Sequence, residues 1–199
     1  MEKFLKKSQK MKFKNITEVT SKQLANIVSN DSLRPTMTGV YIDSEFSVIA
    51  GTNSHLLMTY PIEIISDEKI SKIVPIEFFN IKKYAGKITR KDIQFLEYSL
   101  EEDYAKVYYR EKLIFLCSYI AEDYEYPNYR AVIPDGGKTE IREIGVSFKS
   151  LKNISDSLPG TFSQKSGTLS FYGKNKAMKL VFNSDDLQIV GILMPYIGL

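Results

Sequence analysis

The sequence predicts an α+β protein in which antiparallel sheets carry helices on one face. A pattern of one strand, one helix and about three strands occurs three times along the chain. The strands within each group are separated by short turns, which favours antiparallel hairpins over parallel crossovers. Each predicted helix has its apolar residues on one side, so it needs a sheet to pack against.

The first unit begins with a strand near Lys12. A helix over about residues 20–29 follows, because Leu24, Ile27 and Val28 fall on one helical face. The run Ser-Asn-Asp-Ser ends this helix. Three strands are predicted after it, near residues 39–42, 46–50 and 55–62.

The second unit begins with a short strand at residues 72–74. Pro75 suits the start of a helix, since the N–H that it lacks has no partner there. The helix is predicted over about residues 76–85, and Gly86 provides its C-terminal cap. Three strands follow, near residues 92–98, 105–109 and 113–120.

The third unit starts at Ile141. Its helix, over about residues 148–158, places Leu151, Ile154 and Leu158 on one face. The dipeptide Pro-Gly then ends the helix. Strands near residues 168–172, 178–182 and 187–194 complete the chain.

The turn-rich stretch at residues 134–138 marks the clearest break in the chain. We therefore expect a basic tail over residues 1–11, a domain of two units over residues 12–134 and half a domain over residues 139–199. Residues 1–14 hold six lysines and one glutamate, a charge of +5, so the other 185 residues sum to −2. Such a tail either holds phosphates electrostatically or is simply a solvated extension.

The composition is that of an ordinary soluble globular protein, with 43% hydrophobic and 26% charged residues. No apolar run approaches the length that spans a bilayer. The single cysteine, Cys117, lies in an apolar run, which favours a buried, inert thiol and a reducing, cytoplasmic location.

The sequence offers little support for catalysis. One histidine and one cysteine exclude the common zinc patterns, and no Gly-rich phosphate loop or nucleophile-elbow sequence is present. An enzyme is therefore the less favoured interpretation. We expect no catalytic residue, no metal, no cofactor and no membrane partner.

Three segments stand out, at residues 33–57, 126–134 and 190–196. They include Thr-Asn-Ser-His-Leu-Leu, Tyr-Pro-Asn-Tyr-Arg-Ala-Val-Ile-Pro and Val-Gly-Ile-Leu-Met-Pro-Tyr. In this order they resemble the bacterial sliding clamp, the beta subunit of DNA polymerase III. The resemblance implies a clamp-like fold of repeated units. The larger predicted part looks like the middle domain of that family, and the smaller part looks like the second half of its last domain.

In that family, a hydrophobic pocket between the middle and last domains receives a linear peptide from polymerases and other clients. Aliphatic and Met side chains suit the apolar anchors of an extended peptide. The matching positions are Met37, Thr52, Ser54, His55, Leu56, Leu57, Pro127, Val132, Met178, Ile192, Leu193, Met194, Pro195 and Tyr196.

Taken one at a time, these features have simpler interpretations. His55 would be an ordinary hydrogen-bonded residue, and Pro195 would merely end a strand. The chain also departs from the family pattern. Asn53 stands where Asp is usual, Leu56 where Arg is usual, and Ala131 where a larger basic side chain is common. Serines occupy two helix positions that often carry a polar and an aromatic pocket residue, namely Ser147 and Ser150. We therefore expect a more apolar site with a different peptide preference.

The resemblance also implies contact with DNA. The helices of clamps line a channel, where basic side chains touch phosphates without sequence preference. The candidates here are Lys22, Lys82, Lys83, Lys149 and Lys152. An ordinary solvated helix face is an equally good interpretation of these lysines.

The sequence thus predicts a sliding clamp-like processivity factor. It would bind double-stranded DNA without sequence preference and tether a DNA polymerase or another replication protein through the pocket. Encirclement requires a closed ring, so we expect a homo-oligomer. The alternative is a monomeric, clamp-derived module that binds clamp-interaction peptides without encircling DNA.

Overall fold

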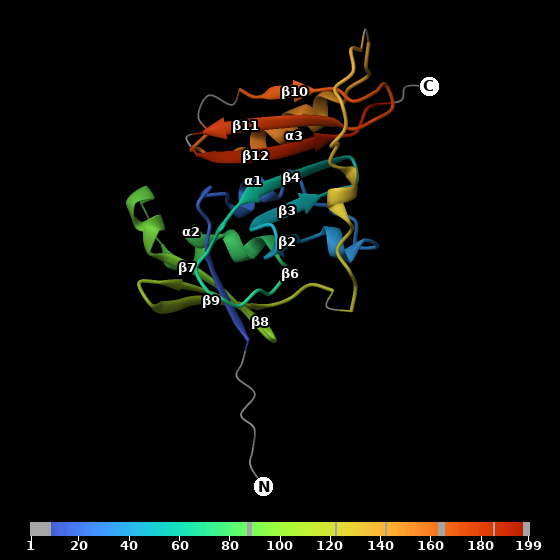
Figure 1. Ribbon diagram of the computed structural model, residues 1–199. Coiled ribbons are helices and arrows are strands. Elements are labelled where there is room, and N and C mark those ends of the chain that lie inside the picture. Colours follow the sequence, from blue (N-terminus) through green and yellow to red (C-terminus); the bar gives the residue numbers. More distant parts are fainter. Residues whose placement is uncertain are drawn as a thin grey trace.

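The computed structural model describes residues 9–86, 89–121, 123–141, 143–162, 166–184 and 186–196. Its strands form two antiparallel sheets with few and short helices (Figure 1). One sheet has five strands in the order β5-β1-β7-β8-β9, and the other has seven in the order β10-β11-β12-β4-β3-β2-β6. The predicted α+β class with antiparallel pairing is confirmed.

The five-stranded sheet packs one of its faces against the main hydrophobic core. Its strands are β1 (Lys10–Lys14), β5 (Glu63–Ile64), β7 (Leu96–Glu101), β8 (Tyr104–Tyr109) and β9 (Lys112–Ser118). In β1 the fully buried Met11 and Phe13 alternate with lysines, as expected for a strand with one face on the core. Met11 pairs with Leu100, so the basic tail predicted over residues 1–11 ends before Lys10. Residues 1–8 of that tail lie outside the described residues.

The seven-stranded sheet joins the two parts that the sequence separates. Its strands are β2 (Val40–Asp43), β3 (Val48–Thr52), β4 (Leu56–Pro61), β6 (Lys72–Val74), β10 (Thr168–Ser170), β11 (Met178–Ser184) and β12 (Leu187–Leu193). Strand β4 pairs antiparallel with β12, and Leu57 lies opposite Ile192. The segments predicted as a domain and a half-domain therefore share one continuous sheet.

The helices match the prediction best in the third unit. They are α1 (Ser21–Leu24), α2 (Ile81–Ala85), α3 (Phe148–Ser157) and the 3-10 helices η1 (Pro35–Met37), η2 (Ile76–Phe79), η3 (Arg90–Phe95) and η4 (Tyr129–Val132). The side chain of Ser147 caps α3 by accepting a hydrogen bond from the N–H of Ser150. Gly86 ends α2 with a φ of +68°, the conformation that glycine adopts without strain.

Two predicted helices are shorter or interrupted. The helix expected over residues 20–29 ends at Leu24, and turns then carry the buried Ile27 against Gly51. The N–H groups of Ile27 and Val28 both donate to the carbonyl oxygen of Leu24, so the chain goes on in tighter turns, and a Cβ at Gly51 would lie 2.5 Å from Ile27 Cδ1. The second helix breaks at Asn80, which has φ −89° and ψ +58° and divides η2 from α2.

Two predicted strands also differ from the structure. The strand expected from residue 92 begins only at Leu96, because Thr89 and Asp92 form a capping box that starts η3. The described residues from Thr139 to Ser147 form no strand, although Ile141 was expected to start one. The N–H of Thr139 donates to the carbonyl oxygen of Phe171, directly after β10, at 2.9 Å, but no strand pairing follows from it in the described residues.

One main hydrophobic core runs through all three units and joins the first to the third. The fully buried Tyr60 of β4 donates a hydrogen bond to the carbonyl oxygen of Ser157 at 3.2 Å. Gln23 Nε2 of α1 donates to the carbonyl oxygen of Leu158 at 2.8 Å. Helices α1 and α3 contact each other, and α3 also contacts β4 and β12. Every helix in the described part of the chain is too short or too polar to cross a lipid bilayer.

Candidate functional site: a pocket at the junction of β4 and β12

A small pocket of about 210 Å³ lies where β4 meets β12. Its walls come from the end of η1, the turn between β3 and β4, the segment that leads into η4, and the end of β12. Ten of the predicted peptide-binding residues line it: Met37, Thr52, Ser54, His55, Leu56, Leu57, Pro127, Val132, Ile192 and Met194. Segments that lie far apart in the sequence therefore share one concave surface.

The turn between β3 and β4 is shaped by its own side chains. Asn53 Oδ1 accepts hydrogen bonds from the N–H groups of His55 and Leu56, each at 3.1 Å. Thr52 Oγ1 donates to the carbonyl oxygen of Leu56 at 2.8 Å, and Ser54 has a φ of +75°. An Asn oxygen accepts these bonds as an Asp oxygen would, so the departure at Asn53 keeps the turn intact. Ser54 and His55 are left exposed at the pocket edge.

The floor of the pocket is apolar and packed. Leu57 and Ile192 are cross-strand neighbours that are nearly fully buried, and they form a second hydrophobic cluster with Tyr129. Val132 and Met194 stand at the rim, 44% and 40% exposed. A preformed apolar floor with exposed apolar rim residues suits the side chain of an extended peptide.

Four of the predicted residues do not line the pocket. Leu193 follows Ile192 on β12, so its side chain points to the opposite face, into the main core, together with its cross-strand partner Met178. Pro195 is half-buried outside the lining, and Tyr196 is 65% exposed. Leu56 lines the pocket but also belongs to the main core, where it lies opposite Leu193. The expected apolar substitution at Leu56 therefore contributes mostly to the core.

The structure adds residues that the sequence did not single out. Asn128 and Tyr129 line the pocket, and both lie within the segment of residues 126–134 already noted for its resemblance. Arg34 Nη1 donates to Ser54 Oγ at 2.8 Å, and Ser54 Oγ lies 3.4 Å from Met37 Sδ. Arg34 lies within the segment of residues 33–57 noted for its resemblance, but it was not named as a pocket residue, because its contact with Ser54 depends on tertiary structure.

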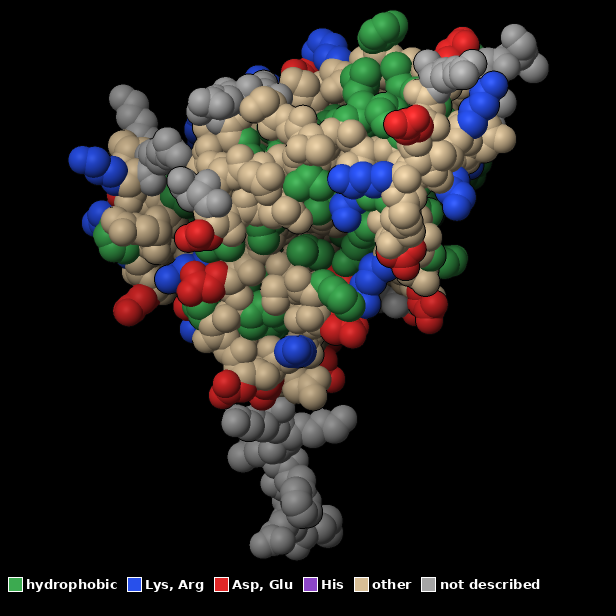
Figure 2. Space-filling model, turned by 45° about the horizontal axis from the view of Figure 1, so that its top comes forward, with side chains coloured by type: hydrophobic (Ala, Val, Ile, Leu, Met, Phe, Trp, Pro, Cys, Tyr) green, Lys and Arg blue, Asp and Glu red, His purple; other side chains and the backbone are tan. Residues whose placement is uncertain are grey.

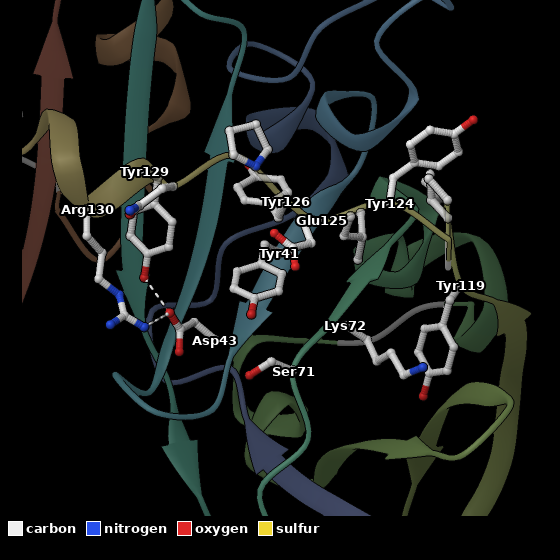
Figure 3. A pocket seen from close by; sticks show the side chains of 15 residues that line it. Tyr41, Asp43, Ser71, Lys72, Tyr119, Tyr124, Glu125, Tyr126, Tyr129 and Arg130 are labelled. Carbon is white, nitrogen blue, oxygen red and sulfur yellow. Dashed lines mark hydrogen bonds and ion pairs between the residues drawn. The ribbon is translucent and has the colours of Figure 1, made fainter.

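A buried carboxylate holds η4, and hence Val132, in place. Asp43 Oδ2 accepts hydrogen bonds from Tyr129 Oη and Arg130 Nη2, each at 2.8 Å (Figure 3). Asp43 Oδ1 accepts from the N–H of Phe46 at 3.2 Å, and the Asp43 side chain is 1% exposed. These groups border a second, tyrosine-rich pocket of about 550 Å³, which shares Pro127, Asn128 and Tyr129 with the first. The hydrogen bonds from Tyr129 and Arg130 to Asp43 therefore hold a wall that both pockets share.

The hydrogen bonds to Asp43 outweigh the effect of its burial. Burial alone would raise the pKa of this carboxyl, but hydrogen bonds from Arg130, Tyr129 and the backbone of Phe46 hold the pKa below its ordinary value of 3.8. Burial and the adjacent carboxylate raise the pKa of Tyr129, so its hydroxyl stays protonated and donates. Asp43 is therefore charged at neutral pH.

The segment that follows the pocket residues of β12 is held by a close backbone approach at Gly145. The N–H of Tyr196 donates to the carbonyl oxygen of Gly145 at 2.9 Å, and a Cβ at Gly145 would lie 2.3 Å from Tyr196 O. The resemblance implies that this pocket receives a linear peptide, and we expect Gly145→Ala to displace Met194 and to weaken binding of such a peptide about threefold to tenfold, equivalent to about 1 kcal/mol. Fluorescence anisotropy with a labelled peptide measures the affinity of the variant and of the wild type.

Gly136→Ala and Gly137→Ala are matched controls, since a Cβ at either position meets nothing within 4 Å. Equal peptide affinity in all three variants would show that the approach at Gly145 does not position Met194.

The predicted DNA-contacting lysines all lie exposed on helices. Lys22 is on α1, and Lys82 and Lys83 are on α2. Lys149 and Lys152 are on α3, and Lys152 forms an ion pair with Asp156. Lys22 and Lys82 line the same groove of about 470 Å³. On the face drawn in Figure 2, basic and acidic side chains are interspersed, in keeping with a body of nearly neutral charge.

The described residues contain no cluster of three or more His, Cys, Asp or Glu side chains that could hold a metal ion. Burial, together with the charge of Glu77, raises the pKa of the Cys117 thiol to about 12. A thiol with so high a pKa is a poor nucleophile at neutral pH.

Two antiparallel sheets built from repeated units, each with a helix followed by three strands, define the fold of a DNA sliding clamp. Solved structures that the chain resembles include beta subunits of bacterial DNA polymerase III. It matches the Bacillus subtilis clamp with a TM-score of 0.66 at 15% identity, covering 100% of this chain and 67% of that one. The Borrelia burgdorferi subunit gives 0.64 at 16% identity, again over the whole of this chain. The predicted resemblance in fold is confirmed.

A third similar structure is the Helicobacter pylori clamp bound to a DNA ligase peptide, with a TM-score of 0.66, 13% identity, and coverage of 98% of this chain and 68% of that one. No protein-family model matches the sequence, and a search of curated proteins finds no significant match. The chain spans 64% of the length of the Borrelia subunit, so it corresponds to part of a clamp chain.

Proposed function

We propose that this protein is a clamp-like replication factor that captures a short linear peptide of a DNA polymerase or another replication protein. The single observation that carries the proposal is the pocket at the junction of β4 and β12, where three distant segments meet over an apolar floor. The peptide of DNA ligase bound to the Helicobacter pylori clamp provides a precedent within the same fold. The proposed role is non-enzymatic and cytoplasmic.

The pocket chemistry suits an extended peptide with an apolar anchor. Leu57 and Ile192 offer a buried aliphatic floor, and the flexible side chain of Met194 adapts to anchors of different shape. Ser54 and His55 are exposed at the edge, where they meet a polar residue of the peptide. An apolar floor with few polar groups at its edge is the usual form of a peptide-anchor site.

A labelled peptide of the type Gln-x-x-Leu-Phe tests the proposal directly. We expect saturable binding of micromolar strength, measured by fluorescence anisotropy. Truncation of the 40%-exposed Met194 to alanine should weaken binding about tenfold, or about 1.4 kcal/mol, without unfolding the protein. A peptide with both apolar anchors replaced by alanine is the control. Unchanged affinity after both the Met194 substitution and the change in the peptide would contradict the proposal that this pocket binds the peptide.

We further propose that the protein assembles into a homo-oligomer and holds double-stranded DNA against its helices. Lys22, Lys82, Lys83, Lys149 and Lys152 would contact phosphates there. Such contacts weaken with salt and carry no sequence preference. Molecular mass in solution by light scattering, with and without DNA, tests assembly. Longer retention on circular than on linear DNA is the outcome expected for encirclement.

A second candidate function is a monomeric peptide-binding module. It is favoured by β12, which already occupies the edge of β4 within one chain. A single-copy mass at all concentrations, combined with intact peptide binding, would select this function over the ring.

A further inference from the structure

A tyrosine-rich pocket of about 550 Å³ lies beside the pocket at the junction of β4 and β12, which is called the junction pocket below. It is enclosed by strands β2 and β6 and by residues 119–121 and 124–130 (Figure 3). Tyrosine rings present an electron-rich face that attracts cations and stacks with planar groups. Five tyrosines of the described chain line the pocket, namely Tyr41, Tyr119, Tyr124, Tyr126 and Tyr129. This lining favours a ligand that is both cationic and planar.

The two basic residues of the described lining are already engaged, at opposite ends of the pocket (Figure 3). Arg130 Nη2 donates to Asp43 at 2.8 Å, and the guanidinium carbon lies 3.3 Å from the centroid of the Phe46 ring. At the other end, Lys72 Nζ lies 4.8 Å from the centroid of the Tyr119 ring. The aromatic rings around this pocket therefore already hold two cations of the chain itself.

The middle of the pocket contains a carboxylate without a partner. Glu125 is exposed and lies there together with Tyr41 and Tyr126, whose rings stack 5.0 Å apart at an angle of 9° (Figure 3). In the described part of the chain, no hydrogen bond or ion pair reaches the Glu125 carboxylate or the Tyr41 hydroxyl. A guanidinium can pair with a carboxylate and stack on an aromatic ring at the same time. An anion would instead meet the charge of Glu125.

The tyrosine-rich pocket and the junction pocket share one wall, which is formed by Pro127, Asn128 and Tyr129. Asn128 is exposed on this wall, whereas Tyr129 is buried and donates a hydrogen bond to Asp43. An extended chain advances about 3.3 Å per residue, so about four residues carry it across a wall of this length. A peptide with its apolar anchor in the junction pocket can therefore place a further side chain in the tyrosine-rich pocket.

We propose that the tyrosine-rich pocket binds an arginine of the client peptide, about four residues from the apolar anchor. The guanidinium pairs with the carboxylate of Glu125 and stacks on the ring of Tyr41. This inference rests on the proposed capture of a peptide in the junction pocket, and it adds a charged determinant to an otherwise apolar site. The protein thereby distinguishes between clients that carry the same apolar motif.

Peptides of the type Gln-x-x-Leu-Phe with one added arginine test this subsite. The arginine stands about four residues before or about four residues after the apolar anchors, and reference peptides carry glutamine or glutamate at the same place. We expect one of the two arginine peptides to bind the wild-type protein about fivefold to tenfold more tightly than its glutamine reference. Isothermal titration calorimetry measures the affinities. The glutamate peptide should bind no more tightly than the glutamine peptide.

Two substitutions of Glu125 and one matched control locate the effect in the protein. Glu125→Gln should abolish the advantage of arginine and leave the affinity for the glutamine peptide unchanged. Glu125→Lys should reverse the preference, so that the glutamate peptide binds more tightly than the arginine peptide. Asp123→Asn is the control, because Asp123 is an exposed acid of the same segment that does not line the pocket. This variant should retain the advantage of arginine.

The outcomes separate the arginine subsite from the junction pocket. If the glutamine peptides bind and Met194→Ala weakens their binding, but arginine adds no affinity, the arginine subsite alone is overturned. An advantage of arginine that survives Glu125→Gln also overturns it. The same holds for an advantage that Asp123→Asn removes equally, since the effect would then come from general charge. If none of the peptides binds, the proposed function and the arginine subsite are both overturned.

Discussion

Replacement of Val132 by aspartate should reduce binding of the clamp-motif peptide at least about thirtyfold, which corresponds to about 2 kcal/mol. Val132 is 44% exposed at the pocket rim, where the peptide anchor would cover it. The substitution leaves a charge that has no partner once the peptide binds, and the desolvation of an unpaired charge is costly. Isothermal titration calorimetry with the labelled and unlabelled peptide measures the effect.

The control for this variant is Leu113→Asp, which changes a side chain of 45% exposure on the other sheet. It should bind the peptide as the wild type does. Circular dichroism and thermal unfolding should show that both variants remain folded, since neither position is in the core. If Val132→Asp binds the peptide with wild-type affinity, the peptide does not bind in this pocket.

Replacement of Asp43 by asparagine should lower the free energy of unfolding by about 3 kcal/mol. The asparagine amide carries hydrogens towards the donors Tyr129 Oη and Arg130 Nη2, which lie 2.8 Å from the present carboxylate oxygen. Arg130 then loses a buried partner and keeps only the exposed Glu45, at 3.2 Å. Urea unfolding monitored by circular dichroism measures the loss.

The pH dependence of this difference follows from the lowered pKa of Asp43. A carboxyl whose pKa is lower in the folded state contributes stability that is fully present above its unfolded value, here near 3.8, and lost as the pH falls through the folded value. The gap between wild type and Asp43→Asn should therefore be constant near neutral pH and shrink in acid. Glu45→Gln is the control, because its side chain is 70% exposed and should cost less than about 1 kcal/mol. A gap that persists unchanged in acid would argue against a charged Asp43.

The structure brings predicted site residues together where their place depends on the order of the segments in the chain. The Asn53 turn, the strand that holds Leu57 and the end of β12 came together as the resemblance implied. Predicted residues lie outside the pocket where the direction of a side chain decides. Leu193 and Met178 share the pocket strands but face the core. Successive side chains of a strand point to opposite faces of the sheet. An error of one residue therefore places a core residue in the pocket, or a pocket residue in the core.

The sequence by itself determined the helix of the third unit, the cap at Gly86, the antiparallel hairpins and the apolar character of β9. These features depend on residues close together in the chain, whose propensities and turns act locally. Only the tertiary structure decided that α1 ends at Leu24 and that Arg130 neutralises Asp43. It also decided that β12 completes the sheet at β4 across the predicted boundary. These outcomes depend on packing and charge pairing between distant segments, and such contacts exist only once the core has formed.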